Sequence, residues 1–197
     1  MGTTTLIVII VVAVVVVVLL LALFFASRRR AAQRSEEQRE RSREEFGSEY
    51  ERTAQERGSE EEAERELRER RGRVERRVEP LSQESRGRYE EQWGEVERVF
   101  VNNPERSIEL ADRTVSDILN ERNFVSDAGQ SDEETERSLA AMHPDVADDY
   151  REARGIRAEV VARSAGRADE GSNEESTEEL RQAIRKYRAV YERLVTE

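Results

Sequence analysis

Residues 177–195 read TEELRQAIRKYRAVYERLV, and they decide the fold class because they carry the clearest helical pattern in the chain. Their large apolar side chains recur at alternating spacings of four and three residues, which places them on one face of an α-helix. These side chains are Leu180, Ile184, Tyr187, Tyr191 and Leu194. The stretch is therefore predicted to be an amphipathic helix that packs against other elements.

The sequence from Pro80 to this helix predicts further helices of the same kind. Asn103-Pro104 is a typical helix start, with Asn as the cap and Pro at the first helical position. No segment alternates apolar and polar residues with a period of two, as a half-buried strand would. We therefore expect an all-α fold in which residues 80–197 form an antiparallel bundle of four or five helices. The expected ranges are 83–101, 104–121, a short helix around Leu139 and Met142, 144–165 and 177–195.

Residues 6–26, LIVIIVVAVVVVVLLLALFFA, are apolar at every position. A helix of this length spans roughly 30 Å, the thickness of the hydrocarbon core of a bilayer. A cleaved signal peptide is the competing interpretation, but it requires a basic segment before a shorter apolar run. The preceding residues, MGTTT, contain no basic side chain. A retained transmembrane helix over 6–26 is predicted, with 1–5 as a short extracytoplasmic tail.

Basic residues give the predicted helix an orientation. Arg28, Arg29 and Arg30 follow the apolar run directly, and basic residues next to a membrane span stay in the cytoplasm. The N-terminus is therefore expected outside and residues 27–197 inside. The resulting expectation is a single-pass protein of the plasma (inner) membrane, in contact with the lipid bilayer.

Residues 27–79 are predicted to be a connector rich in Arg and Glu. They contain 16 of each and few apolar side chains, too few to bury a core. Leu67, Val74, Val78 and Leu81 have the spacing of a coiled-coil seam, while Gly47, Gly58 and Gly72 would interrupt a continuous rod. Two interpretations stay open, a charged helical or disordered spacer and a weak coiled coil.

Composition excludes several functional classes. The 197 residues carry a net charge of -11, which argues against a nucleic-acid partner because such binding begins with phosphate neutralisation. There is no Cys and only one His, His143, which precedes Pro144 at a helix start and is expected to be a cap or a surface side chain. No catalytic set, phosphate-binding loop or small-molecule substrate site is evident. We expect no enzyme and no cofactor.

Four acidic residues are weak candidates for a metal site. Asp145, Asp148, Asp149 and Glu152 lie in the first turns of one predicted helix, where carboxylates from one face could bind a hard cation. Acidic residues are also expected at a helix N-terminus because the helix dipole stabilises them there. The second explanation is the simpler one, and metal binding stays a minor alternative.

The order of segments resembles a family of small single-span membrane proteins of actinobacteria. The resemblance rests on MGTTTL with the Val-rich span, EEFGSEYERTAQERGS at 44–59, the 78–119 block that contains YEEQWGEVERVF, and STEELRQAIRKYRAVYERL at 176–194. It covers nearly the whole chain. It implies a membrane anchor followed by a cytoplasmic helical domain, and it supplies no catalytic or ligand-binding residue.

The layout of anchor, connector and acidic bundle favours a membrane-anchored interaction or scaffold protein. A protein partner with a basic surface would suit the charge of residues 80–197, which carry 28 acidic and 17 basic side chains. The alternative is a self-assembling rod with the plan of an ATP synthase b subunit. A divalent-metal-binding protein is the third and weakest hypothesis.

Overall fold

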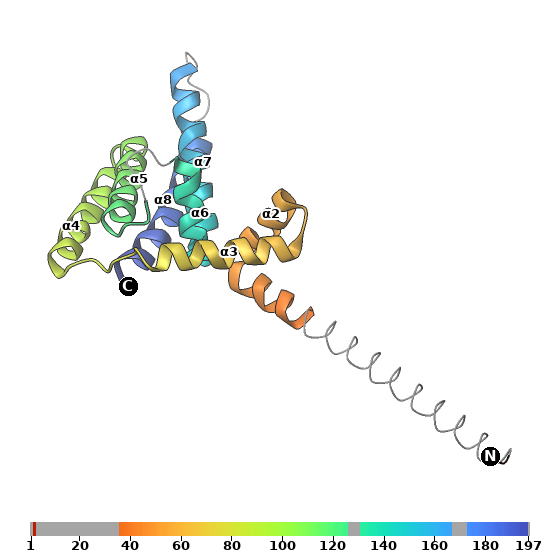
Figure 1. The fold of residues 1–197 in the computed structure, drawn as a ribbon. Helices are drawn as coiled ribbons and strands as arrows, with labels where there is room; N and C mark the ends of the chain where they lie inside the picture. Colours follow the sequence, from red (N-terminus) through yellow and green to blue (C-terminus); the bar gives the residue numbers. More distant parts are fainter. Residues whose placement is uncertain (1, 3–35, 126–130, 167–172, 197) are drawn as a thin grey trace. The chain divides into compact units, whose positions relative to one another are not determined.

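Helices are the regular secondary structure of the computed structural model, and the residues that it describes contain no strand. Those residues are 2, 36–125, 131–166 and 173–196. The all-α prediction is therefore confirmed for the described chain. The helices, in order, are α2 (Ser48–Arg57), α3 (Glu60–Glu75), α4 (Gln83–Phe100), α5 (Pro104–Glu121), α6 (Asp132–Met142), α7 (Pro144–Gly166) and α8 (Asn173–Thr196) (Figure 1).

The chain divides into two compact units, Met1–Glu44 and Glu45–Glu197. In the first unit, residues 36–44 are helical, and Nη1 of Arg39 lies 3.7 Å from Oε1 of Glu36. None of the helices formed by described residues has both the length and the apolar character needed to cross a membrane. The predicted transmembrane helix at 6–26 and the arginines at 28–30 lie outside the described residues, so both stay predictions.

Polar side chains cap the helices of the second unit. Ser82 Oγ accepts a hydrogen bond from the backbone N–H of Ser85 at 3.0 Å, and Asn103 Oδ1 accepts one from Arg106 at the same distance. Ser131 caps α6 in the same way. Each cap pairs a backbone donor that the first turn of a helix leaves unsatisfied. The predicted helix start at Asn103-Pro104 is confirmed.

The predicted apolar face of α8 forms the centre of the main core, where α8 packs against α7 and α5. The Tyr191 ring stacks on Trp93 of α4 with centroids 4.5 Å apart. Tyr187 meets Tyr150 of α7 edge-on, with centroids 6.3 Å apart. Aromatic pairs of these geometries contribute about 0.5–1.5 kcal/mol beyond the burial of their area. Figure 1 shows α7 and α8 side by side, with the α4–α5 hairpin beside them.

Residues 45–79 differ from the predicted connector, because they fold as part of the second unit. Helices α2 and α3 form a hairpin that packs against α6 and contacts α7. Phe46, Tyr50 and Leu67 make a small core of their own, and Val74 joins the main core. The helical domain therefore begins at Glu45, whereas the composition placed its boundary at Pro80.

The apolar residues that suggested a coiled-coil seam pack against other parts of the same chain. Leu67, Val74 and Leu81 are buried, and Val78 is partly buried against the main core. Leu67 and Val74 lie on the buried face of α3, and Val78 and Leu81 follow in the linker to α4. The partner of that face is the chain's own domain, so these side chains are not exposed to a second copy.

Two of the three glycines in this segment flank α2, and the third lies inside α3. Gly47 and Gly58 precede and follow α2 with φ of 52° and 71°, a backbone region that favours glycine. Together they let the short helix begin and end sharply. Gly72, by contrast, lies inside α3 without interrupting it.

A buried arginine joins three distant segments of the domain. Arg122, 4% exposed, follows α5, and its Nη1 donates to the carbonyl of Leu194 at 2.8 Å. Its Nε donates to the carbonyl of Glu79 at 3.2 Å, and the Glu79 N–H donates back to the Arg122 carbonyl at 3.1 Å. The guanidinium also lies over the ring of Phe124, 5.4 Å from its centroid. Arg122 thus ties the α3–α4 linker and the end of α8 to the end of α5.

The packing of the α2–α3 hairpin can be tested with Leu67→Ala. Truncating this fully buried side chain should lower the free energy of unfolding by about 2–5 kcal/mol, because it leaves a cavity against Phe46 and Tyr50. Urea unfolding followed by circular dichroism measures the change. Val101→Ala, at a position 80% exposed, is the control and should change the value by less than about 0.5 kcal/mol. A Leu67→Ala protein as stable as this control would restore the solvated-spacer interpretation.

Candidate functional site

The four acidic residues singled out as weak metal candidates bind cations of the chain itself. Lys186 Nζ of α8 lies 2.8 Å from Asp149 Oδ1 and 2.8 Å from Glu152 Oε2. Hydrogen bonds from these carboxylates, Asp149 first, raise the pKa of the Lys186 ammonium. One side of the α7 N-terminal region is thus fastened to α8.

The other two candidates lie in different surroundings. Both carboxylate oxygens of Asp148 accept from Ser48 Oγ, at 2.8 and 2.7 Å, and Asp148 also pairs with Arg151. Asp145 Oδ2 lies 3.4 Å from Nη2 of Arg193 near the end of α8. The four carboxylates therefore do not converge, and no group of acidic or His side chains suited to a metal ion occurs among the described residues. These ion pairs depend on tertiary contacts with α2 and α8, which helical spacing alone does not reveal.

A buried carboxylate between α2, α3 and α7 was not anticipated from the sequence. Glu49 is 2% exposed, and its oxygens lie 3.2 Å from Arg52, 3.4 Å from Arg70 and 3.5 Å from Arg151. Burial raises the pKa of the Glu49 carboxyl, and the three guanidinium groups oppose that shift. The ion pairs of Glu49 connect α2, α3 and α7. The cluster therefore fastens the α2–α3 hairpin to the rest of the domain.

A second cluster surrounds Asp112 of α5. Tyr187 donates its phenol hydrogen to Asp112 Oδ1 at 3.0 Å, and the same carboxylate lies 3.6 Å from Arg154 and 3.4 Å from Arg157. Burial and the Asp112 charge raise the pKa of the Tyr187 phenol. This partly buried cluster links α5, α7 and α8.

His143 is the C-cap of α6 and is buried, whereas the sequence predicted a cap at the start of the following helix or a surface side chain. It ends α6 at 4% exposure, and its ring lies 5.8 Å from the Phe124 ring. Its backbone N–H donates to the Leu139 carbonyl at 2.7 Å. These contacts give His143 a structural role between α6 and α7.

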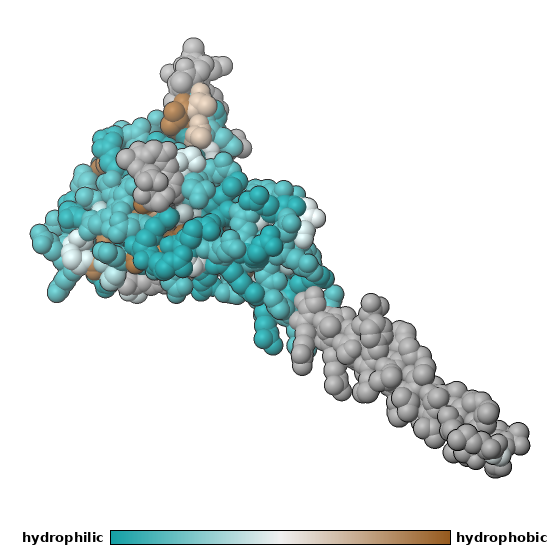
Figure 2. All heavy atoms as spheres, in the orientation of Figure 1, coloured by the Kyte–Doolittle hydropathy of each residue, from teal (hydrophilic) through white to brown (hydrophobic). Residues whose placement is uncertain are grey.

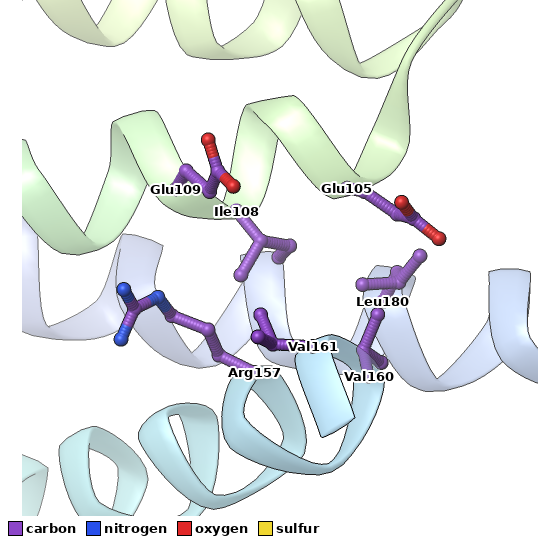
Figure 3. Close-up of a pocket in the computed structure, with 7 residues that line it drawn as sticks. All are labelled: Glu105, Ile108, Glu109, Arg157, Val160, Val161 and Leu180. Atoms are coloured by element: carbon purple, nitrogen blue, oxygen red, sulfur yellow. The ribbon is translucent and has the colours of Figure 1, made fainter. Parts of the chain in front are cut away.

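Among the described residues, a candidate binding site is a hollow of about 150 Å³ between α5, α7 and α8. Its apolar lining includes the buried Ile108 and Leu180 together with Val161, which is 50% exposed. In Figure 3, Ile108 points from α5 toward the valines of α7, with the two carboxylates on either side of it. We call this feature the α5–α7–α8 hollow; its lining residues are Glu105, Ile108, Glu109, Arg157, Val160, Val161 and Leu180.

The hollow stands out because the rest of the described surface is mainly polar. On the face drawn in Figure 2, hydrophilic residues cover most of the described chain. Val101 and Val161 are the large apolar side chains that stay exposed among the described residues, and Val161 lines the hollow. An exposed apolar group beside a concave apolar lining is typical of a binding site.

The lining of the hollow carries two carboxylates and one guanidinium. Glu105 and Glu109 lie on α5 at its rim, and Arg157 is paired with Asp112. Residues 1–44 contain seven arginines and four glutamates, which leaves a net charge of -14 on residues 45–197. Sequence reasoning found the acidic excess but missed the hollow, because its lining comes from three helices whose register only the fold sets.

Comparison with protein-family models, curated proteins and solved structures finds no match to the chain. The resemblance to actinobacterial single-span proteins therefore stays a prediction from the sequence. The function has to be inferred from the domain and the hollow themselves, because function resides in sites rather than in folds.

Buried tyrosines predict a loss of stability in alkaline solution. Burial raises the pKa of Tyr89 and Tyr191, raises that of Tyr150 to about 12, and raises that of Tyr187. A phenol of the unfolded chain ionises near pH 10, roughly its ordinary pKa. Because the folded state holds its protons more tightly, its stability is fully present below about pH 10 and falls as the pH rises toward 12.

Urea unfolding between pH 8 and 11.5 measures this dependence. Tyr187→Phe is the matched variant, since it keeps the ring and removes the ionising group. It should lose stability at pH 8, where the bond to Asp112 is missing, and show a shallower decline above pH 10. An unfolding free energy that stays constant to pH 11.5 would contradict the prediction.

Proposed function

We propose that the chain is a membrane-anchored interaction protein whose helical domain binds a cytoplasmic protein partner with a basic surface. The observation that carries the proposal is the charge of the compact unit 45–197, a net -14, in a chain with a 21-residue apolar stretch at 6–26. The apolar stretch would fix the protein in the membrane, and the acidic domain would supply the binding surface.

Charge of this size favours particular partners. A domain with a net charge of -14 repels nucleic acid and anionic lipid headgroups, and it attracts basic proteins over roughly 8 Å at physiological ionic strength. Such attraction raises association rates and discriminates between partners more than it increases affinity. The three arginines at 28–30 would stay at the membrane face, where they favour a cytoplasmic location for the helical domain.

Self-assembly through the connector has less support than partner binding. A rod with the plan of an ATP synthase b subunit needs an exposed apolar seam over many turns. Here the seam residues of α3 are packed against the chain's own domain. Metal binding also has less support, since the four candidate carboxylates are engaged by Ser48, Arg151, Lys186 and Arg193.

Anchoring and orientation give the first test. The full-length protein should stay in the membrane fraction after alkaline carbonate extraction, and deletion of residues 6–26 should release it. Two reporters can be fused after Glu197, one that is active only in the cytoplasm and one that is active only outside the cell. The cytoplasmic reporter should be active and the other inactive. The opposite result would contradict the proposed orientation, and extraction of the full-length protein by carbonate would contradict the anchor.

Partner binding gives the second test. Cross-linking in intact cells should capture a defined basic protein with the full-length chain, and deletion of residues 45–197 should abolish the capture. The complex should weaken as salt rises, because its attraction is screened. Capture of the chain by itself alone would favour self-assembly and would overturn the partner proposal.

A further inference from the structure

We propose that the α5–α7–α8 hollow receives an apolar side chain from a basic amphipathic helix of the partner, an inference that rests on the proposed function. The binding mode is a helix laid along a groove, with its apolar row in the hollow and its basic residues on the acidic side chains of α5. Three properties of the hollow support it: its size, its charge and the spacing of its glutamates.

The size of the hollow fits one large side chain. A dry apolar cavity of roughly 150 Å³ in another protein binds a benzene-sized molecule. The α5–α7–α8 hollow has about the same volume and opens beside Val161. A leucine or aromatic side chain entering it would contact Ile108 and Leu180, which already form its apolar lining. Anchors of this kind supply most of the binding energy in protein interfaces.

Charge selects a basic partner over a second copy of this chain. A copy would bring another domain with a net charge of -14 to the same face. Arg157, which shares Asp112 with Arg154, offsets only one of the two carboxylates that line the hollow. Glu109 contacts Arg106 at 2.6 Å, but both side chains are close to half exposed. An exposed pair of that kind is worth roughly 0.2–1 kcal/mol and can exchange for a partner cation.

The spacing of the two glutamates favours a helix as the ligand. Glu105 and Glu109 are four residues apart on α5, so they lie on the same face. Residues at this spacing on a helix have Cβ atoms about 5–6 Å apart. A partner helix with lysines or arginines four residues apart would reach both carboxylates by displacing the contacts that each already makes within the chain.

The chain has no cysteine, so a single fluorescent label can report on the hollow. Val161→Cys and Val101→Cys are each labelled with bimane in the full-length protein, held in nanodiscs of neutral lipid. The probe is a lysine–leucine amphipathic helix with one tryptophan on its apolar face, because tryptophan quenches bimane on contact. Saturable quenching is expected at position 161 and not at 101. Empty nanodiscs correct for binding of the peptide to lipid.

Charge is tested with matched peptides and variants. A glutamate–leucine helix of the same pattern should not quench the label. Glu105→Gln with Glu109→Gln should weaken binding of the lysine–leucine helix about 2- to 30-fold, the sum expected from two exposed ion pairs. Glu91→Gln at an exposed position of α4 is the control and should leave binding nearly unchanged. Equal quenching at 161 and 101, or equal binding of the two peptides, would overturn the inference.

A test in cells separates this inference from the proposed function. Val161→Lys should abolish capture of the basic partner, and Val101→Lys, which makes the same charge change outside the hollow, should preserve it. Circular dichroism confirms that both variants stay folded. Capture that survives Val161→Lys but is lost on deletion of 45–197 would overturn the hollow as the docking site and leave the proposed function standing. Self-association lost in Val161→Lys would assign the hollow to a second copy instead.

Discussion

The buried guanidinium of Arg122 holds together the segments on which the rest of the domain is arranged. Its hydrogen bonds to the carbonyls of Glu79 and Leu194 bring the α3–α4 linker and the end of α8 to the end of α5. With those ends fixed, α8 runs along α7 and α5, and its apolar face becomes the centre of the core. A guanidinium suits this task because its five donors can satisfy carbonyls from several segments at once. A buried charge without these partners would be costly.

Ion pairs have a similar role in the α2–α3 hairpin. This segment has few apolar residues, and its own small core consists of Phe46, Tyr50 and Leu67. Glu49 adds a bridge to arginines on its own helix, on α3 and on α7. Burying a charge is favourable only when its partners are buried or positioned with it. The hairpin therefore depends on the surface of α6 and α7, and composition alone made it look like a solvated spacer.

These contacts explain which parts of the structure could be predicted from the sequence. The face of α8 and the cap at Asn103 follow from local periodicity and capping, and the structure has them where the sequence places them. The placement of α3 and the fate of Asp145, Asp148, Asp149 and Glu152 depend on residues up to 100 positions away, such as Ser48. No local pattern contains that information. The hollow could not be predicted from the sequence for the same reason, because its lining residues come from three helices.

The charges of the domain have two different effects. Paired charges stabilise the fold, and the excess of negative charge favours a basic partner. Opposed charges hold the helices together around the buried Glu49 and the partly buried Asp112. The excess of negative charge lies in addition to these pairs, and a net -14 on one domain costs stability through self-repulsion. Fold stability does not account for such an excess. A basic partner would relieve the repulsion on binding, and the apolar hollow between α5, α7 and α8 would give that partner a defined position.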